Sequence, residues 1–323
     1  MRRVVCTEWG APEGLEVQEH PDLEPGPGQV VVEVAAAGVN FVDALFVAGT
    51  YQIKIPPPFT PGSECAGVIS ALGEGVEGLD VGDRVIAAGG LGGYASQIAV
   101  SAAAVTRVPD DLSLAMAAAV VQSYCTAWFT LTRRISVVSG ETVLVLGAGG
   151  GVGLAAIDVA RSLGATVIAA ASSAEKLEAA LVAGASATID YSTEPIKDRA
   201  RELSPGGVDV VIDPIGGDAT EASLRALRFG GRLAVIGFAA GTIPKIPTNQ
   251  VLLNNRSVVG VDWGAWAMHN PADQGVLLRE VLDAVVAGTL SPAAPSERPL
   301  DEAAAVLREA LDRRVVGKVV LVP

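Results

Sequence analysis

The sequence predicts an α/β protein in two parts, a strand-rich domain followed by a doubly wound parallel sheet. Residues 1 to about 120 hold short β-type runs separated by glycine- and proline-rich turns, which is typical of a compact strand-rich domain. From Thr142 onward, strand patterns alternate with helix patterns, and such alternation builds a parallel sheet with helices on both faces. Five glycines between Gly147 and Gly153 mark the first strand-to-helix turn of this second part.

Length and composition limit the classes of protein that are possible. The chain has 323 residues, half of them apolar, which is enough for two domains. Its net charge is -13 and no basic run exceeds a pair, so we expect no nucleic-acid partner. We also expect no membrane span, because no uninterrupted apolar run reaches about 18 residues. With no signal-peptide pattern and only three scattered cysteines, the expected location is cytoplasmic.

The first part contains five expected strands and one long apolar segment. This segment, residues 112–134, predicts one or two buried helices that link the two parts. The strands are expected at 29–40, 64–73, 83–89, 94–100 and 104–110.

The second part reads as strand and helix in turn. A first strand at 142–147 precedes a helix that ends at Gly164, and the next helix has Ser172 or Ser173 as its N-cap. Two further helices follow, and a strand at 256–263 ends the alternation. The pattern of the remaining residues predicts two helices and a last strand, 317–323, which returns to the first domain. The remaining expected elements are strands at 166–172, 186–191, 207–217 and 231–237 and helices at 173–184, 194–204 and 218–230.

The glycine cluster predicts a dinucleotide-binding turn. A tight turn after a strand needs glycine, and a pyrophosphate can approach the backbone only where Cβ atoms are missing. The helix that follows offers free N–H groups and the positive end of its dipole. A structural turn without a ligand is the alternative, but the strand and helix on either side favour nucleotide binding. The expected contacts are Gly149, Gly150, Gly151, Val152 and Gly153.

The end of the second strand predicts NADPH rather than NADH. Sites specific for NADH place an acidic residue there to hold the ribose 2′-hydroxyl, whereas this chain has Ser172 and Ser173. Two hydroxyl groups, with Lys176 one turn later, can instead accept a 2′-phosphate. The alternatives are that a serine only caps the helix and that Lys176 is a solvated surface residue. On this interpretation Glu175 faces away from the site.

Several segments resemble the medium-chain dehydrogenase/reductase superfamily almost from end to end. They include residues 35–51, 58–76, 81–85, 234–241 and 256–264, in addition to the glycine turn. The branch they resemble is the zinc-free NADPH:quinone oxidoreductases related to zeta-crystallin. The resemblance implies a GroES-like strand-rich catalytic domain at 1–125 and a Rossmann NADPH-binding domain at 126–262. A C-terminal segment, 263–323, would return to the catalytic domain, and the resemblance also implies a homodimer formed through the Rossmann sheets.

The zinc ligands of the related alcohol dehydrogenases are missing from the sequence. Those proteins have Cys where this chain has Asn40, and Gly-His-Glu where it has Gly62-Ser63-Glu64. A catalytic zinc ion needs about three Cys, His or carboxylate ligands. We therefore expect no zinc, and reduction of a small electrophilic substrate rather than oxidation of an alcohol.

Asn40, Asp43 and Tyr51 are the candidate catalytic residues that the resemblance implies. Asn40 can donate a hydrogen bond to a carbonyl oxygen that gains charge, and Tyr51 can do the same or pass a proton. The alternatives are a turn residue for Asn40 and a helix cap for Asp43. Many quinone oxidoreductases have Tyr two residues after this Asp, where the present chain has Leu45, which predicts a more apolar pocket.

Further cofactor contacts come from the resemblance alone. Thr126 matches a position near the nicotinamide, although a helix-interior Thr that bonds its own backbone is the alternative. Tyr191 matches a residue beside the adenosine ribose, and Gly237 and Phe238 match a loop that holds the nicotinamide. Trp263 and Trp266 are expected at either the pocket or an interface.

Three functions agree with these observations. The first is an NADPH-dependent, zinc-independent reductase of quinones or α,β-unsaturated carbonyls. The second is a reductase of enoyl thioesters. The segment 50–64 is more similar to relatives that reduce enoyl thioesters or small enones than to the other quinone oxidoreductases. The third is a protein that binds NADPH without catalysis, as the lens crystallins of the family that this chain resembles illustrate.

Overall fold

A computed structural model describes residues 1–88 and 90–323, which form two compact units. The first unit combines residues 1–122 with 294–323, and the second is residues 123–293. The chain enters the second unit at Ser123, and the sequence analysis placed this boundary after residue 125. The return to the first unit comes later than residue 263, because two helices of the tail belong to the second unit.

The first unit is built on a seven-stranded sheet that is largely antiparallel. Its strands follow the order β14-β15-β3-β4-β5-β7, and β6 pairs with β3. A separate two-stranded sheet joins β1 and β2. Residue 89, at the end of one expected strand, lies outside the described residues. The elements are β1 (Arg2–Val5), β2 (Glu16–Glu19), β3 (Gln29–Gly38), α1 (Phe41–Val47), β4 (Glu64–Leu72), β5 (Arg84–Ala88), β6 (Gln97–Ser101), β7 (Val105–Arg107), β14 (Ser296–Pro299), α10 (Ala303–Leu311) and β15 (Val319–Val322).

The last strand of the chain completes the first unit, as expected from the sequence. β15 pairs antiparallel with the end of β3, with Val320 opposite Gly38, and parallel with β14. Its residues Val320 and Leu321 are fully buried, so apolar side chains on both faces of the strand are shielded from solvent. The chain end is therefore part of the sheet that positions the residues after β3.

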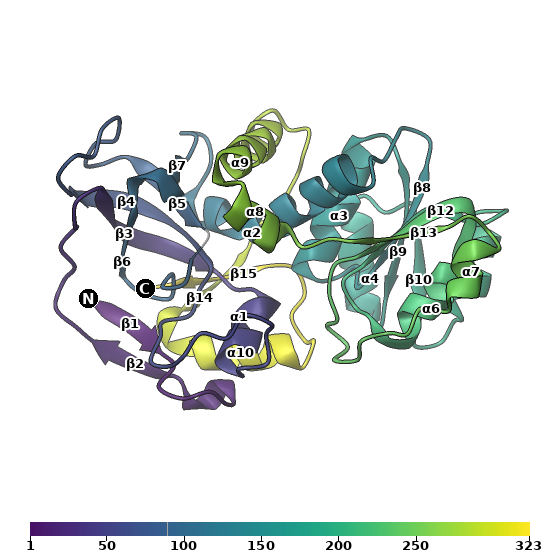
Figure 1. Cartoon of the computed structure of the whole chain (residues 1–323), viewed down its shortest axis with the longest axis horizontal. Coiled ribbons are helices and arrows are strands. Elements are labelled where there is room, and N and C mark those ends of the chain that lie inside the picture. The colour runs from purple at the N-terminus through teal and green to yellow at the C-terminus, as the bar shows by residue number, and fades with distance from the viewer. Residues whose placement is uncertain (89) are drawn as a thin grey trace. The chain divides into compact units, whose positions relative to one another are not determined.

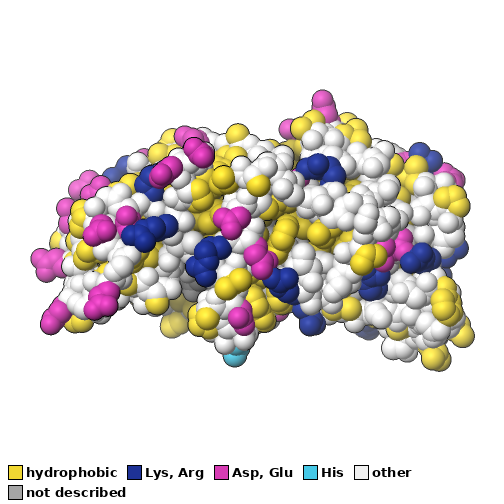
Figure 2. Space-filling model, turned by 90° about the horizontal axis from the view of Figure 1, so that it is seen from above, with side chains coloured by type: hydrophobic (Ala, Val, Ile, Leu, Met, Phe, Trp, Pro, Cys, Tyr) yellow, Lys and Arg dark blue, Asp and Glu magenta, His cyan; other side chains and the backbone are white. Residues whose placement is uncertain are grey.

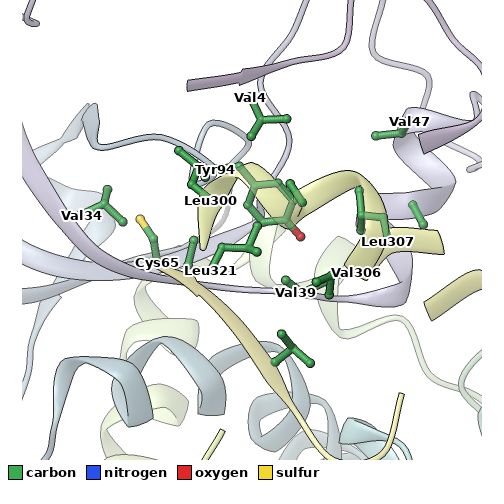
Figure 3. Packing of buried hydrophobic residues seen from close by; sticks show 14 of the residues in the cluster. Val4, Val34, Val39, Val47, Cys65, Tyr94, Leu300, Val306, Leu307 and Leu321 are labelled. Atoms are coloured by element: carbon green, nitrogen blue, oxygen red, sulfur yellow. The ribbon is translucent and has the colours of Figure 1, made fainter. Parts of the chain in front are cut away.

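The core of the first unit gathers residues from both ends of the chain. Val4 of β1, Val47 of α1 and Leu307 of α10 pack in one cluster (Figure 3). Tyr94 lies within it, fully buried, with its ring among these aliphatic side chains (Figure 3). A buried tyrosine needs a partner for its hydroxyl group, and this partner is described below.

The second unit is a six-stranded parallel sheet in the order β10-β9-β8-β11-β12-β13. Helices of this unit, among them α3 and α6, surround the sheet (Figure 1). The order runs outward in both directions from β8 and β11, as in dinucleotide-binding folds, which confirms the predicted doubly wound sheet. The elements are β8 (Thr142–Leu146), α3 (Gly151–Ser162), β9 (Thr166–Ala171), α4 (Ala174–Val182), β10 (Ala187–Asp190), α5 (Ile196–Leu203), β11 (Val208–Asp213), α6 (Gly217–Ala226), β12 (Leu227–Val235), α7 (Thr248–Leu252), β13 (Ser257–Gly260), α8 (Trp263–His269) and α9 (Pro271–Val286).

The apolar segment at 112–134 forms α2 (Leu114–Trp128) followed by a π-helical turn, Phe129–Arg134. It is long and apolar enough to cross a membrane, but 72% of its most apolar window is buried inside the protein. This burial is what a core helix of a folded domain shows.

The face in Figure 2 carries its Lys and Arg side chains in separate groups rather than in one continuous basic stripe.

Candidate functional site

The glycine turn lies where the strand order of the second unit reverses. β8 ends at Leu146, and Gly147 then adopts a φ of 59°, a conformation that glycine tolerates. A Cβ atom at Gly147 would lie 2.5 Å from Ile215 Cδ1 in the turn after β11. The turns that follow β8 and β11 are therefore in contact, and ligands of open α/β sheets bind at this switch point.

Two glycines of the turn differ in what surrounds them. A Cβ atom at Gly153 would lie 2.3 Å from the carbonyl oxygen of Gly147, so this glycine allows α3 to pack against the turn. Gly150 is the N-cap of α3, with φ -89° and ψ 168°, which any residue can adopt. A Cβ atom there would meet only Gly147 O, at 3.6 Å. Gly150 thus borders open space at the start of the helix, beside Gly151 and Val152.

The first turn of α4 packs directly on the glycine turn. A Cβ atom at Gly149 would lie 2.4 Å from Lys176 Cβ, so the side chain of Lys176 starts beside the turn. Ser173 is the N-cap of α4 and accepts a hydrogen bond from Lys176 N at 3.5 Å, which is the capping role considered above. Ser172 is exposed. Tyr191 lies nearby, since its N–H donates to the carbonyl oxygen of Ala171 at 3.1 Å.

The predicted nicotinamide loop rests on the turn after β11. The N–H of Gly237 donates to Asp213 O at 3.4 Å, and Phe238 Cδ1 lies beside Gly216. The turn itself is held by Asp213, a fully buried carboxylate that the sequence analysis missed. Its Oδ1 accepts from two backbone N–H groups, those of Ile215 and Gly216, each at 2.9 Å.

Thr126, the other expected nicotinamide contact, lies in α2 and is buried. Its carbonyl oxygen accepts from Thr130 Oγ1 at 2.6 Å. Trp266 stacks on Phe129 with ring centroids 4.6 Å apart, and Trp263 donates to Gln274 Oε1 at 2.7 Å. These contacts give the two tryptophans a packing role within the second unit.

In the first unit, Asn40 and Asp43 lie at the start of α1 inside a buried polar cluster. Asn40 Nδ2 donates to Glu64 Oε1 at 2.8 Å, and Lys318 Nζ donates both to Asn40 Oδ1 at 2.5 Å and to Glu64 Oε1 at 2.6 Å. Glu64 begins β4 and Lys318 precedes β15, so three separate elements meet there. Neither Glu64 nor Lys318 was predicted from the sequence as a member of the site.

Asp43 is fully buried and is the third residue of α1, where its side chain accepts from the backbone of the N-cap residue, Asn40. Its Oδ2 accepts from Asn40 N and from the hydroxyl group of Tyr94, each at 2.9 Å. Its Oδ1 has no hydrogen-bond partner among the described residues. Burial raises the pKa of Asp43 to about 6, against the lowering effect of these hydrogen bonds and of Lys318. The carboxyl group is thus a buried proton-binding site next to Asn40.

Tyr51 follows the opposite end of α1. Its ring packs edge-on against Phe46, with centroids 4.8 Å apart, and its N–H donates to Leu45 O at 3.3 Å. Leu45 and Tyr51 are half-buried. Asn40 and Asp43 therefore share one cluster at the start of α1, whereas Tyr51 belongs to the loop after it.

The described residues around Asn40 and Glu64 do not fit a zinc ion. Where the zinc enzymes have Cys and Gly-His-Glu, this chain keeps one carboxylate, that of Glu64. Its Oε1 already accepts a hydrogen bond from the ammonium group of Lys318. A metal cation there would lie against a fixed positive charge. Within residues 1–88 and 90–323, no group of three or more His, Cys, Asp or Glu side chains is arranged to hold a metal ion.

Asp43→Asn is expected to change the pH dependence of stability. Because the pKa of Asp43 is higher in the folded than in the unfolded chain, its stabilising effect is complete below about pH 4 and is lost as the pH rises through about 6. Relative to the variant, the wild type should lose about 3 kcal/mol of unfolding free energy between about pH 4 and 7. Urea unfolding at several pH values measures this difference. Asp110→Asn, at an exposed position, should follow the wild type, and the same curve for Asp43→Asn would contradict the prediction.

Comparison with known families covers both units. A profile described as the alcohol dehydrogenase GroES-like domain matches residues 26–110, and one described as zinc-binding dehydrogenase matches residues 151–276. The quinone oxidoreductase-like protein 2 homolog of Nematostella vectensis is 38% identical over 99% of this chain and 88% of its own length. Quinone oxidoreductase-like protein 2 of Rattus norvegicus is also 38% identical, over 99% and 91%.

Solved structures agree with this relationship. A quinone oxidoreductase from Pseudomonas syringae has a TM-score of 0.92 at 32% identity, covering 100% of this chain and 99% of its own. The Escherichia coli quinone oxidoreductase in complex with NADPH has a TM-score of 0.93 at 28% identity, covering 100% of both chains. The enoyl reductase CurK has a TM-score of 0.87 at 30% identity, covering 99% and 98%.

The folds of the two units and the similarity to these relatives show that the chain belongs to the medium-chain dehydrogenase/reductase superfamily, with a GroES-like and a Rossmann domain. Within that superfamily, the chain belongs to the quinone oxidoreductase branch. It is an oxidoreductase by family, and the predicted relationship is confirmed.

Proposed function

We propose that this protein is a cytoplasmic, NADPH-dependent and zinc-independent reductase of quinones or α,β-unsaturated carbonyls. The observation that carries the proposal is the contact between Gly149 and Lys176, which brings a cation to the dinucleotide-binding turn. The NADPH-bound relative from Escherichia coli supports the choice of cofactor. Small electrophilic molecules are the proposed partners, and no nucleic acid is among them.

The second unit would hold NADPH through its own residues. The N-terminus of α3, at Gly151 and Val152, would offer N–H groups to the pyrophosphate, and Gly150, whose own N–H donates to Gly147 O, would leave room for it. Lys176 and the exposed Ser172 would bind the 2′-phosphate, beside Tyr191. Gly237, Phe238 and Thr126 would line the nicotinamide end. When bound, NADPH supplies the hydride for the reduction.

Asn40 would bind the acceptor. One N–H of its Nδ2 is used by Glu64, and the second has no acceptor among the described residues. In the proposed reaction this N–H donates to the carbonyl oxygen as negative charge grows on it. Tyr51 is proposed as a second donor or a proton source. Asp43, which is buried and binds the backbone of Asn40, supports the loop rather than contacting the acceptor.

The decay of NADPH absorbance with a panel of quinones, enones and enoyl thioesters tests this proposal. Turnover of a quinone or an enone with NADPH, and slower turnover with NADH, is expected. No turnover of any member of the panel would refute it. Asn40→Ala is the informative variant, because removal of one such donor costs about a hundredfold in kcat.

Reduction of an enoyl thioester is the alternative within the same class. It is favoured by the structural likeness to the enoyl reductase CurK and by Leu45 of α1, which would make the pocket more apolar than a tyrosine at this position would. The same panel distinguishes the two, since a thioester reductase would show a much higher kcat/KM for the enoyl thioester. A protein that binds NADPH without catalysis would bind the cofactor in a calorimeter and reduce none of the panel.

We also propose that the protein is a homodimer formed through the second unit. β13 lies at the edge of the parallel sheet, where a second copy can add its own β13. Large apolar side chains near that edge are exposed, namely those of Phe229, Leu252, Leu253 and Val258. A monomer rarely leaves such a patch uncovered.

Phe229→Glu with Val258→Lys is therefore expected to convert the dimer to a monomer, because the charged groups would be buried in the interface. Light scattering after gel filtration measures the mass. Leu181→Glu, at an exposed position on α4, is the control and should stay dimeric. An unchanged mass for the double variant, or a monomeric wild type, would contradict this assembly.

A further inference from the structure

The carboxylate of Glu64 is held on both oxygens. Oε1 accepts from Asn40 Nδ2 and Lys318 Nζ, and Oε2 accepts from Gln122 N at 2.6 Å. Its side chain is 1% exposed and that of Lys318 is 10% exposed. Buried charges of this kind keep a single arrangement when all their hydrogen bonds are made, because any other arrangement leaves a charge unpaired.

The backbone makes room for this carboxylate. A Cβ atom at Gly38, the last residue of β3, would lie 2.3 Å from Glu64 Oε1 and 2.4 Å from Ala118 O. The glycine at this position therefore allows the charged group to lie between the end of β3 and α2. The strand that brings Lys318 pairs with β3 at the same residue, Gly38.

The two charges determine which way the side-chain amide of Asn40 points. An ammonium group can only donate, so it fixes Oδ1 on its own side, and a carboxylate can only accept, so it fixes Nδ2. A flipped amide would put Nδ2 against Lys318 and Oδ1 against Glu64, with two repulsive contacts. The remaining Nδ2–H is thereby left in one defined direction.

We propose that Glu64 and Lys318 are positioning residues that lock the amide of Asn40 in its donor orientation. The inference rests on the proposed function, in which that N–H binds the acceptor oxygen. Neither residue needs to touch the acceptor. A donor that is already oriented stabilises developing charge without first reorganising.

A double-mutant cycle in kcat tests the proposal. Lys318→Met should lower kcat by about tenfold to a hundredfold, the usual cost of a misplaced group, with the KM for NADPH unchanged. In an Asn40→Ala background the same change should have no further effect, since its action runs through Asn40. Lys318→Arg, which keeps the charge, should recover part of kcat. If Lys318→Met lowers kcat by the same factor in the Asn40→Ala background as in the wild type, the proposal is overturned.

A second measurement needs no turnover, so it tests the orientation of the Asn40 amide even if the proposed function is wrong. In cofactor-free protein with ¹⁵N-labelled asparagine, the side-chain amide signals of Asn40 are identified by their loss in Asn40→Ala. Lys318→Met and Glu64→Gln should each shift or broaden these signals. Arg107→Met, which breaks a surface ion pair with Asp83, should leave them unchanged. Unchanged signals in Lys318→Met would overturn the proposal whatever the enzyme reduces.

Discussion

Lys176→Ala should raise the KM for NADPH by about tenfold or more and leave the KM for NADH within about twofold. The reason is that the lysine side chain starts beside the glycine turn and would meet the 2′-phosphate, which only NADPH carries. A hydrogen bond to a charged group is worth about 1.5 to 3 kcal/mol, and each 1.4 kcal/mol is a factor of about ten. Steady-state kinetics with both cofactors and one acceptor give the two KM values.

Arg225→Ala provides a matched control for the loss of one positive charge. Arg225 lies at the end of α6, directly before β12, and so near the end of the sheet where the parallel strands begin, whereas the glycine turn lies where β8 ends. Its surface ion pair with Glu221 should contribute little to stability. The control should change neither KM. Equal increases for NADPH and NADH in Lys176→Ala would remove the assignment of the 2′-phosphate to this lysine.

Gly150→Ala and Gly153→Ala should separate the two roles of the glycine turn. At Gly153 a Cβ atom would collide with backbone at 2.3 Å, so the variant should lose several kcal/mol of unfolding free energy or fail to fold. At Gly150 a Cβ atom has room and the backbone suits any residue, so the fold should keep its melting temperature. The same methyl group would stand where a pyrophosphate has to approach, and NADPH affinity should fall by at least about tenfold.

Calorimetric titration with NADPH and thermal unfolding of the same samples give both quantities. The result that matters most is Gly150→Ala, because its fold is expected to be intact. Full NADPH affinity in this variant would mean that the turn is structural and that the cofactor, if bound, lies elsewhere. Normal stability of Gly153→Ala would instead contradict the close packing of α3 on the turn.

The parallel sheet could be predicted because its signals are local. Each strand and helix of the alternation has its own periodicity, and glycine or serine marks the ends, as Ser173 does for α4. One boundary was wrong for a non-local reason. The helix expected to Gly230 ends at Ala226, because Leu227 pairs with Val208 of β11 and this pairing overrides the helical pattern.

The polar cluster around Asn40 could not be predicted as a set. Asn40 and Lys318 are 278 residues apart, and Glu64 and Lys318 are 254 apart, so no spacing rule connects them. The available signal was weak: Glu64 and Lys318 each stand at the start of a strongly apolar run, where a charged residue needs a partner. α8 was also missed, although Asp262, which caps it by accepting from Ala265 N at 2.9 Å, was a signal for its start.

The place of β15 in the first sheet also affects how the chain is made. The ribosome releases residues 123–293 as a complete folding unit while β3 still lacks the neighbour that will cover its end. Domains usually fold in the order of synthesis, but here the N-terminal one can close only after β15 has been made. Loss of residues 318–322 would therefore damage the beginning of the protein, since it removes a strand and the ammonium group that neutralises Glu64.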